Sequence, residues 1–401
     1  MIAGVVEPDS PEILNQHEVA AGRWFIQCVY EPAAVGRKGK PTGRAFFSEV
    51  GDLLNVFAVP LTTYLGSEGY PTFSPDGSQV AFQWDGGKSG AGIYVKVIGL
   101  EPPVLVAKTT HGYPAWSPDG RFIAFLGPVP SGNCGVFLVP AVGGPVRKLA
   151  EISSEEAWVA GHFVAWHPDG KWLVAVDKLT PADPYALFLV SSETGEKRRL
   201  TSPPKGIAGD QCPAFSPNGH AIVFARNTIP GGEAGLHILE LTDDLKPIAE
   251  PRRLTSDLPY AADPAWTADG RSVVFTGGEY QRTFLCHLEI QFPGWRPGRI
   301  ERLGFAGDGS SASAISRQGR LAFMRAQPTD TDIWRLELSG GRPIGKPAVR
   351  FISSTRLDHT PAYSPDGRRI AFASNRSGSH QIWVSDSDGG NFMQLNFHRR
   401  K

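Results

Sequence analysis

A four-residue turn motif recurs seven times in this 401-residue chain. Its clearest form is Ser-Pro-Asp-Gly, and the intervals between successive copies are 43, 50, 49, 51, 49 and 48 residues. A repeat of this length indicates an architecture in which each unit buries its apolar faces only against its neighbours. The seven copies begin at Ser74, Ser117, His167, Ser216, Thr267, Ser316 and Ser364.

The residue types of the motif indicate a tight turn between two strands. Proline fixes φ at the first central position, Asp or Asn tolerates the second, and glycine adopts the positive φ that closes the turn. The aspartates of the motif are therefore interpreted as turn formers and not as catalytic acids.

Each repeat contains four segments with strand character, and the last copy shows them most clearly. Pro361–Tyr363 precedes the turn, the apolar run Ile370–Phe372 follows it, Ile382–Val384 comes third, and the more polar Met393–Leu395 comes fourth. In the sixth repeat, the third strand is expected at Ile333–Leu336. Four strands per repeat predict one propeller blade, so the predicted fold is all-β, a seven-bladed β-propeller of four-stranded antiparallel blades.

The repeats also predict the boundaries of the domain. Residues 57–397 form the predicted propeller, residues 1–56 an N-terminal extension that is partly irregular, and residues 398–401 a basic tail. Asn55–Thr62 resembles the third and fourth strands of a blade without the first two, which makes it a candidate for a strand that closes the ring. A fragment of a longer array is the alternative, and the sequence leaves both open.

Charge and patterning exclude several classes of protein. Forty basic and forty acidic residues give a formal net charge of zero without a basic stripe, so we expect no direct nucleic-acid partner. No run of about 18 apolar residues predicts a membrane span, and Met1–Glu12 lacks the basic and apolar parts of a secretory signal. The absence of a GxSxG sequence argues against a serine peptidase. We expect a monomer.

The repeat resembles that of a known family. Residues 361–395 contain, in this order, a small residue with an aromatic, Ser-Pro-Asp-Gly-Arg, Ile-Ala-Phe, Ile-Trp-Val and Asp-Gly-Gly. This order of motifs resembles the repeat of the WD-repeat-like propellers of the bacterial TolB family. Gly135–Pro140 and Glu196–Ser202 are similar to the propeller part of bacterial regulators that begin with a winged helix. The resemblance implies a binding protein and suggests a periplasmic or other extracytoplasmic location. Residues 1–56 are too short and unpatterned for a winged helix plus a membrane segment, so DNA binding is not implied.

Candidate ligand-binding residues stand just before each turn, because propellers bind ligands at the channel mouth and on loops that enter the innermost strand. Polar side chains gather there, and we expect them to ring one end of the channel. Imidazoles and carboxylates also suit a divalent cation, although no particular metal is indicated; the alternative is that they cap strands and hold buried water. The candidates are His111, His162, Asp210, Gln211, Asp263, Asp358 and His359.

These observations favour a non-catalytic scaffold or sensor that recognises a protein, a peptide or a small ligand at the channel face. No catalytic residue is assigned and no cofactor is required. The alternative is a metal-dependent carbohydrate-active enzyme, because oligogalacturonate lyases use a related propeller with a histidine-bound metal. Such an enzyme would depend on channel histidines such as His162 and His359, which lack the close spacing of a metal motif.

Overall fold

The computed structural model describes residues 24–30, 57–62, 64, 67–86, 90–100, 102–153, 163–229, 232–279, 282–326, 333–335, 338–339, 342–343, 349–352, 354, 358–374, 376–377 and 381–395. The chain has two compact units, Arg23–Ala326, and Met1–Gly22 together with Gln327–Lys401. Among the described residues, no helix is both long enough and apolar enough to cross a membrane.

In the unit Arg23–Ala326, the first three repeats each form one antiparallel sheet of four strands in sequence order. The first sheet contains β3 (Glu68–Phe73), β4 (Gln79–Trp84), β5 (Gly92–Val97) and β6 (Val104–Lys108). The second contains β7 (Ala115–Trp116), β8 (Phe122–Pro128), β9 (Cys134–Pro140) and β10 (Arg147–Ile152). The third contains β11 (Val164–Trp166), β12 (Trp172–Asp177), β13 (Ala186–Ser191) and β14 (Lys197–Arg199).

The fourth and fifth repeats have the same order, and one parallel pair, Ala234 with Tyr260, joins them. The fourth sheet contains β15 (Gly209–Phe215), β16 (Ala221–Asn227), β17 (Ala234–Glu240) and β18 (Arg252–Arg253). The fifth contains β19 (Tyr260–Trp266), β20 (Ser272–Glu279), β21 (Arg282–Gln291) and β22 (Arg296–Arg302), and a short 3-10 helix, η3 (Gly304–Ala306), follows it.

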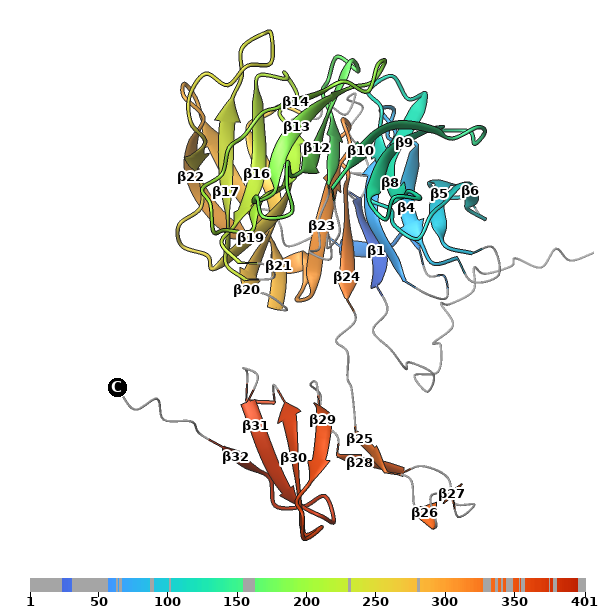
Figure 1. The fold of residues 1–401 in the computed structure, drawn as a ribbon, viewed down its shortest axis with the longest axis vertical. Helices are drawn as coiled ribbons and strands as arrows, with labels where there is room; N and C mark the ends of the chain where they lie inside the picture. Colours follow the sequence, from blue (N-terminus) through green and yellow to red (C-terminus); the bar gives the residue numbers. More distant parts are fainter. Residues whose placement is uncertain are drawn as a thin grey trace, which may run out of the picture. The chain divides into compact units, whose positions relative to one another are not determined.

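The sixth sheet is built from both ends of this unit. Its order is β2 (Phe57–Pro60), β1 (Trp24–Tyr30), β24 (Leu321–Ala326) and β23 (Ser310–Ile315). In Figure 1 the orange strands β23 and β24 therefore lie beside the blue strand β1. The segment predicted to supply a closing strand, Asn55–Thr62, contains β2, whereas the pairing of β1 from within the predicted extension was not foreseen.

The strand predicted for the sixth repeat at Ile333–Leu336 forms as β25 (Ile333–Arg335), but it is not paired in this sheet. β25 (Ile333–Arg335) pairs instead with β28 (Val349–Ile352) in the other unit, where β26 (Leu338–Ser339) pairs with β27 (Arg342–Pro343). The physical reason is that β1 already occupies the free edge of β24, with paired residues from Trp24 opposite Ala326 to Val29 opposite Leu321.

The six first strands surround one axis. β3, β7, β11, β15, β19 and β23 contact one another in this order, and β23 in turn contacts β3. This arrangement of antiparallel four-stranded sheets confirms the predicted all-β, propeller-type fold (Figure 1).

The seventh repeat also forms the predicted four-stranded sheet, in the second unit. It contains β29 (Asp358–Tyr363), β30 (Arg369–Ser374), β31 (Gln381–Asp386) and β32 (Met393–Leu395), paired in sequence order. Because this sheet belongs to the second unit, a single ring of seven blades stays a prediction.

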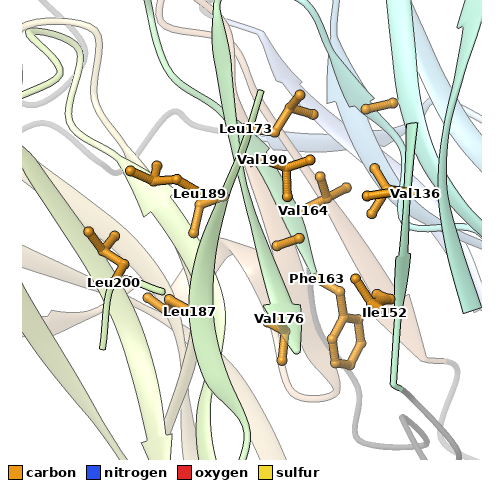
Figure 2. Close-up of a cluster of buried hydrophobic side chains, with 14 of the residues drawn as sticks. Val136, Ile152, Phe163, Val164, Leu173, Val176, Leu187, Leu189, Val190 and Leu200 are labelled. Atoms are coloured by element: carbon orange, nitrogen blue, oxygen red, sulfur yellow. The ribbon is translucent and has the colours of Figure 1, made fainter. Parts of the chain in front are cut away.

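The apolar core lies between neighbouring sheets. Val136 and Ile152 of the second sheet pack in one cluster with Val164, Leu173 and Leu187 of the third (Figure 2). Because both faces of a second strand are covered in this way, those strands are continuously apolar instead of alternating.

Hydrogen bonds and a glycine with positive φ stabilise the turns, as their residue types predict. The Ser117 hydroxyl donates to Asp119 Oδ1 at 2.6 Å, and the same oxygen accepts the Arg121 N–H at 3.0 Å. Gly120 has φ of 78°. Asn218 takes the place of the aspartate in the fourth turn, where its Oδ1 accepts the Ser216 hydroxyl at 2.7 Å.

Candidate ligand site in the channel

An unusual backbone conformation recurs in the first strands, four residues before the turn. Non-glycine residues seldom adopt positive φ, and holding one there costs about 1–3 kcal/mol. The ladder shifts register at this point in four of these strands, which marks a β-bulge that redirects a side chain. In the unit Arg23–Ala326 the residues and their φ values are Tyr70 (53°), Tyr113 (57°), Cys212 (52°), Asp263 (50°) and Ala312 (47°), and Thr360 of the seventh repeat has φ of 55°.

The bulges bring side chains from different sheets together. The ring centroids of Tyr70 and Tyr113 lie 4.4 Å apart, and those of Tyr113 and Phe163 lie 4.7 Å apart. Tyr70 lies in β3, whereas Tyr113 and Phe163 lie just before β7 and β11. Three aromatic rings from successive repeats therefore pack against one another near the start of the first strands.

Asp263 approaches this aromatic cluster from the fifth sheet. Burial raises the pKa of Tyr70 well above its ordinary value, and the nearby Tyr113 and the negative charge of Asp263 raise it further. Burial likewise raises the pKa of Tyr113, to about 12. Both phenols therefore remain protonated near neutral pH and keep their hydroxyls as hydrogen-bond donors.

Asp210 and Gln211 are buried at the start of β15, and each has a partner in the neighbouring strand β16. Arg226 donates to both carboxylate oxygens of Asp210, at 2.6 and 3.0 Å. Asn227 Nδ2 donates to Gln211 Oε1 at 2.9 Å. These contacts fit the alternative interpretation for this pair, in which polar residues stabilise the start of a strand.

Asp263 and His111 differ from that pair. Asp263 is 1% exposed, and the Thr276 hydroxyl donates to its Oδ2 at 3.3 Å. His111 is half-buried, with its Nδ1 3.3 Å from the Thr110 hydroxyl. Of the predicted residues in this unit, Asp263 is the one whose charge reaches the aromatic cluster.

His162 and the side chain of His359 lie outside the described residues. Asp358 belongs to the second unit, where Arg376 Nη2 donates to its Oδ1 at 2.9 Å. In the described part of the chain, no group of three or more His, Cys, Asp or Glu side chains is placed to hold a metal ion.

Of the residues with positive φ in this unit, sequence reasoning selected Asp263 and missed the others. Counting back five and six positions from the turn selected Asp210 and Gln211, whereas Tyr70, Tyr113 and Cys212 stand four positions back. A sequence signal does exist, because a proline directly follows Tyr70, Tyr113, Cys212 and Asp263. Proline lacks the N–H that a regular ladder requires, so it fits an interruption of the pairing.

Comparison with known proteins supports the family resemblance at the level of fold. No family model matches the sequence. The chain is 27% identical over 127 residues to the Tol-Pal system protein TolB of Bordetella pertussis, which covers 32% of this chain and 27% of TolB. A solved structure of a TolB-type protein from Agrobacterium tumefaciens superposes with a TM-score of 0.55 at 18% identity, over 77% of this chain and 100% of that one. The propeller resembles that TolB-type structure in fold.

Two further proteins are similar to this chain, but neither similarity indicates an activity for it. An uncharacterized protein of Agrobacterium fabrum is 24% identical over 254 residues, covering 57% of this chain and 74% of that protein. An oligogalacturonate lyase from Vibrio parahaemolyticus has a TM-score of 0.45 at 14% identity, over 82% of this chain and 93% of the lyase, which is too distant to bear on chemistry. The resemblance to winged-helix regulators stays a prediction.

Proposed function

We propose that this TolB-like propeller is a non-catalytic binding protein that recognises a protein, a peptide or a small ligand at the end of the channel where the first strands begin. The supporting observation is the recurring positive φ shared by Tyr70, Tyr113 and Asp263, whose side chains lie close enough to interact. Strained residues concentrate where a structure is organised for binding. The similarity to TolB supports a periplasmic location as part of this proposal.

A screen of small probes tests the proposal. Ligand-detected NMR with blocked amino-acid amides, short peptides and oligosaccharides is expected to find probes that bind the wild-type chain. Asp263→Asn and Tyr113→Leu should weaken those probes about tenfold, since each removes one polar group from the site. Glu233→Gln, in the loop before β17, is the control and should leave binding unchanged. Probes that bind all variants equally would place recognition elsewhere.

The enzymatic alternative makes a different prediction. A metal-dependent lyase should cleave oligogalacturonate when supplied with a divalent cation and should lose that activity in His162→Ala or His359→Ala. For a binding protein we expect no cleavage at any metal concentration. Cleavage that disappears on adding a chelator and in both histidine variants would replace the proposed function.

The seven-bladed ring expected from the repeats is a further part of this proposal. The seventh sheet has the strand order of the first five. A single ring of seven would require the sixth sheet to take its third and fourth strands from the segment 333–352, in place of β1 and β2. The truncations described in the Discussion distinguish this arrangement from a ring of six.

A further inference from the structure

A cavity of about 710 Å³ lies at the opposite end of the first strands from the proposed channel site. The turns of the second and third sheets line it, together with the loop Ser191–Glu193 between β13 and β14 and with Arg317 from the sixth turn. This volume falls within the range of about 300–1,000 Å³ that is usual for ligand pockets.

The sixth turn differs from the other six, which have proline or alanine where it has Arg317. Its polar side chains reach neighbouring turns: Gln318 Nε2 donates to the Pro75 carbonyl at 3.4 Å and Arg320 Nη1 to the Gly77 carbonyl at 2.8 Å. Arg317 makes one long contact, from Nη2 to the Pro118 carbonyl at 3.3 Å. Since a guanidinium has five N–H donors, most donors of Arg317 remain available to a ligand.

Two carboxylates of the cavity are already used inside their own turns. Asp119 accepts the Ser117 hydroxyl and Arg121 Nε, both at 2.6 Å. Asp169 accepts the Lys171 N–H at 2.8 Å, and its Oδ1 lies 2.8 Å from His167 Nδ1. These groups stabilise turns and offer little to a ligand.

The side chains of Lys171, Arg317 and Glu193 are less engaged, although the Lys171 charge helps to lower the pKa of Asp169 after the stronger effect of His167. Among the described residues, neither the Lys171 ammonium nor the Glu193 carboxylate has a hydrogen bond or ion pair, and Arg317 has no carboxylate partner. The cavity therefore presents two cations and one anion from three separate elements. Phosphate would bring two negative charges close to three carboxylates, so a singly charged carboxylate fits better.

Apolar surface accompanies these charges. Pro118, Pro168 and Trp172 line the cavity. The Trp172 ring packs against the Arg198 guanidinium, which lies 5.6 Å from its centroid. Proline and tryptophan are suited to contacts with an extended peptide, whose side chains pack on apolar walls while polar groups fix its register.

We propose that this cavity binds an extended acidic peptide. A carboxylate of the peptide lies between Arg317 and Lys171, where charge-assisted hydrogen bonds are strongest. Glu193 accepts a peptide N–H from the same segment. This second binding site is independent of the channel site and does not require it.

The experiment uses four probes with the full-length chain: acetyl-Ala-Asp-Ala-Ala-amide, its Asn counterpart, its Lys counterpart, and digalacturonate. Binding is measured by ligand-detected NMR titration. We expect the Asp peptide to bind at least about fivefold more tightly than the Asn peptide, with an affinity that falls as salt rises because the cations are exposed. Equal binding of the Asp and Asn peptides, or binding of digalacturonate without the Asp peptide, would overturn the proposal.

Variants locate the binding. Arg317→Gln and Lys171→Gln should each weaken the Asp peptide by about five- to tenfold. Arg296→Gln on β22 and Lys205→Gln in the loop before β15 are matched controls that should not. Because Arg317 contacts the second turn, its variant is checked by thermal unfolding; Lys171 has no side-chain partner among the described residues, so its variant tests the site without that complication. Unchanged affinity in Lys171→Gln would refute the assignment.

Discussion

At the scale of single residues, the left-handed bulge is the feature that most constrains the channel. Ala312 has φ of 47° and is 2% exposed. A β-branched residue is poorly accommodated in this conformation and in this space, so Ala312→Val should lower the free energy of unfolding by about 2 kcal/mol. Ala312→Gly should change it by less than about 1 kcal/mol, because relief of strain offsets the lost methyl group.

Urea unfolding of both variants measures these effects. The control is Ala314→Val, two residues further along β23, where the structure has no positive φ. If valine cost as much at position 314 as at position 312, the positive φ would not be the cause.

The turn aspartates predict the response to acid. The Ser74 hydroxyl and then the Ser78 hydroxyl and N–H lower the pKa of Asp76 from 3.8 to about 2. A carboxylate with a lowered pKa stabilises the fold above its unfolded pKa, and this contribution is lost as the pH falls through the folded pKa. Stability should therefore decrease between about pH 4 and pH 2.

Asp76→Asn isolates this contribution, since asparagine already fills the same place in the fourth turn as Asn218. The slope of the urea midpoint against pH in that interval should be shallower in the variant than in the wild type. Identical slopes would show that Asp76 does not contribute to acid sensitivity.

The candidate site could be predicted only in part, and the bulge explains the limit. Alternation along a strand assigns side chains to two faces, but one inserted residue reverses that assignment. Asp210 and Gln211 were expected to face the channel, which stays a prediction, and they bind Arg226 and Asn227 of the neighbouring strand. Asp263, taken from the bulge position itself, is the candidate that acts on the aromatic cluster.

At the scale of elements, the repeat predicts strands well and their partners less well. The apolar run Leu321–Phe323, which follows the sixth turn as Ile370–Phe372 follows the seventh, lies in the second strand β24 as the repeat predicts. Its neighbour could not be identified from local sequence, because two segments suit the same edge: β1, more than 290 residues earlier in the chain, and the segment that contains β25. Long-range pairing depends on competition between such segments, which a repeat pattern does not rank.

A cross-link tests which segment pairs with β24. Cys28 of β1 lies opposite Ala322 of β24. Ala322→Cys should therefore form a disulfide with Cys28 under mild oxidation, because directly paired strand positions meet the distance that a disulfide requires. Peptide mapping by mass spectrometry identifies the product.

The control is Ala371→Cys, at the corresponding position of β30, which lies opposite Val384 and has no cysteine partner there. Absence of the Cys28 cross-link in Ala322→Cys, with both variants folded, would assign the edge of β24 to another segment.

At the scale of the whole molecule, the placement of β1 and β2 determines which part of the chain folds alone. The first strands from β3 to β23 form a closed cycle of contacts within Arg23–Ala326. A chain of residues 23–326 should therefore unfold cooperatively, with a urea midpoint near that of the full-length chain. Removing residues 1–30 instead deletes β1, which exposes an edge of β24 and separates β2 from its sheet. This second chain should lose most of its stability or aggregate, since an unpaired strand edge promotes association.

A ring of seven that uses residues 333–352 predicts the reverse: the chain lacking residues 1–30 would fold, and the chain ending at Ala326 would not. Circular dichroism and size-exclusion chromatography of the two truncated chains distinguish these outcomes, because each arrangement requires the segment that the other can lose.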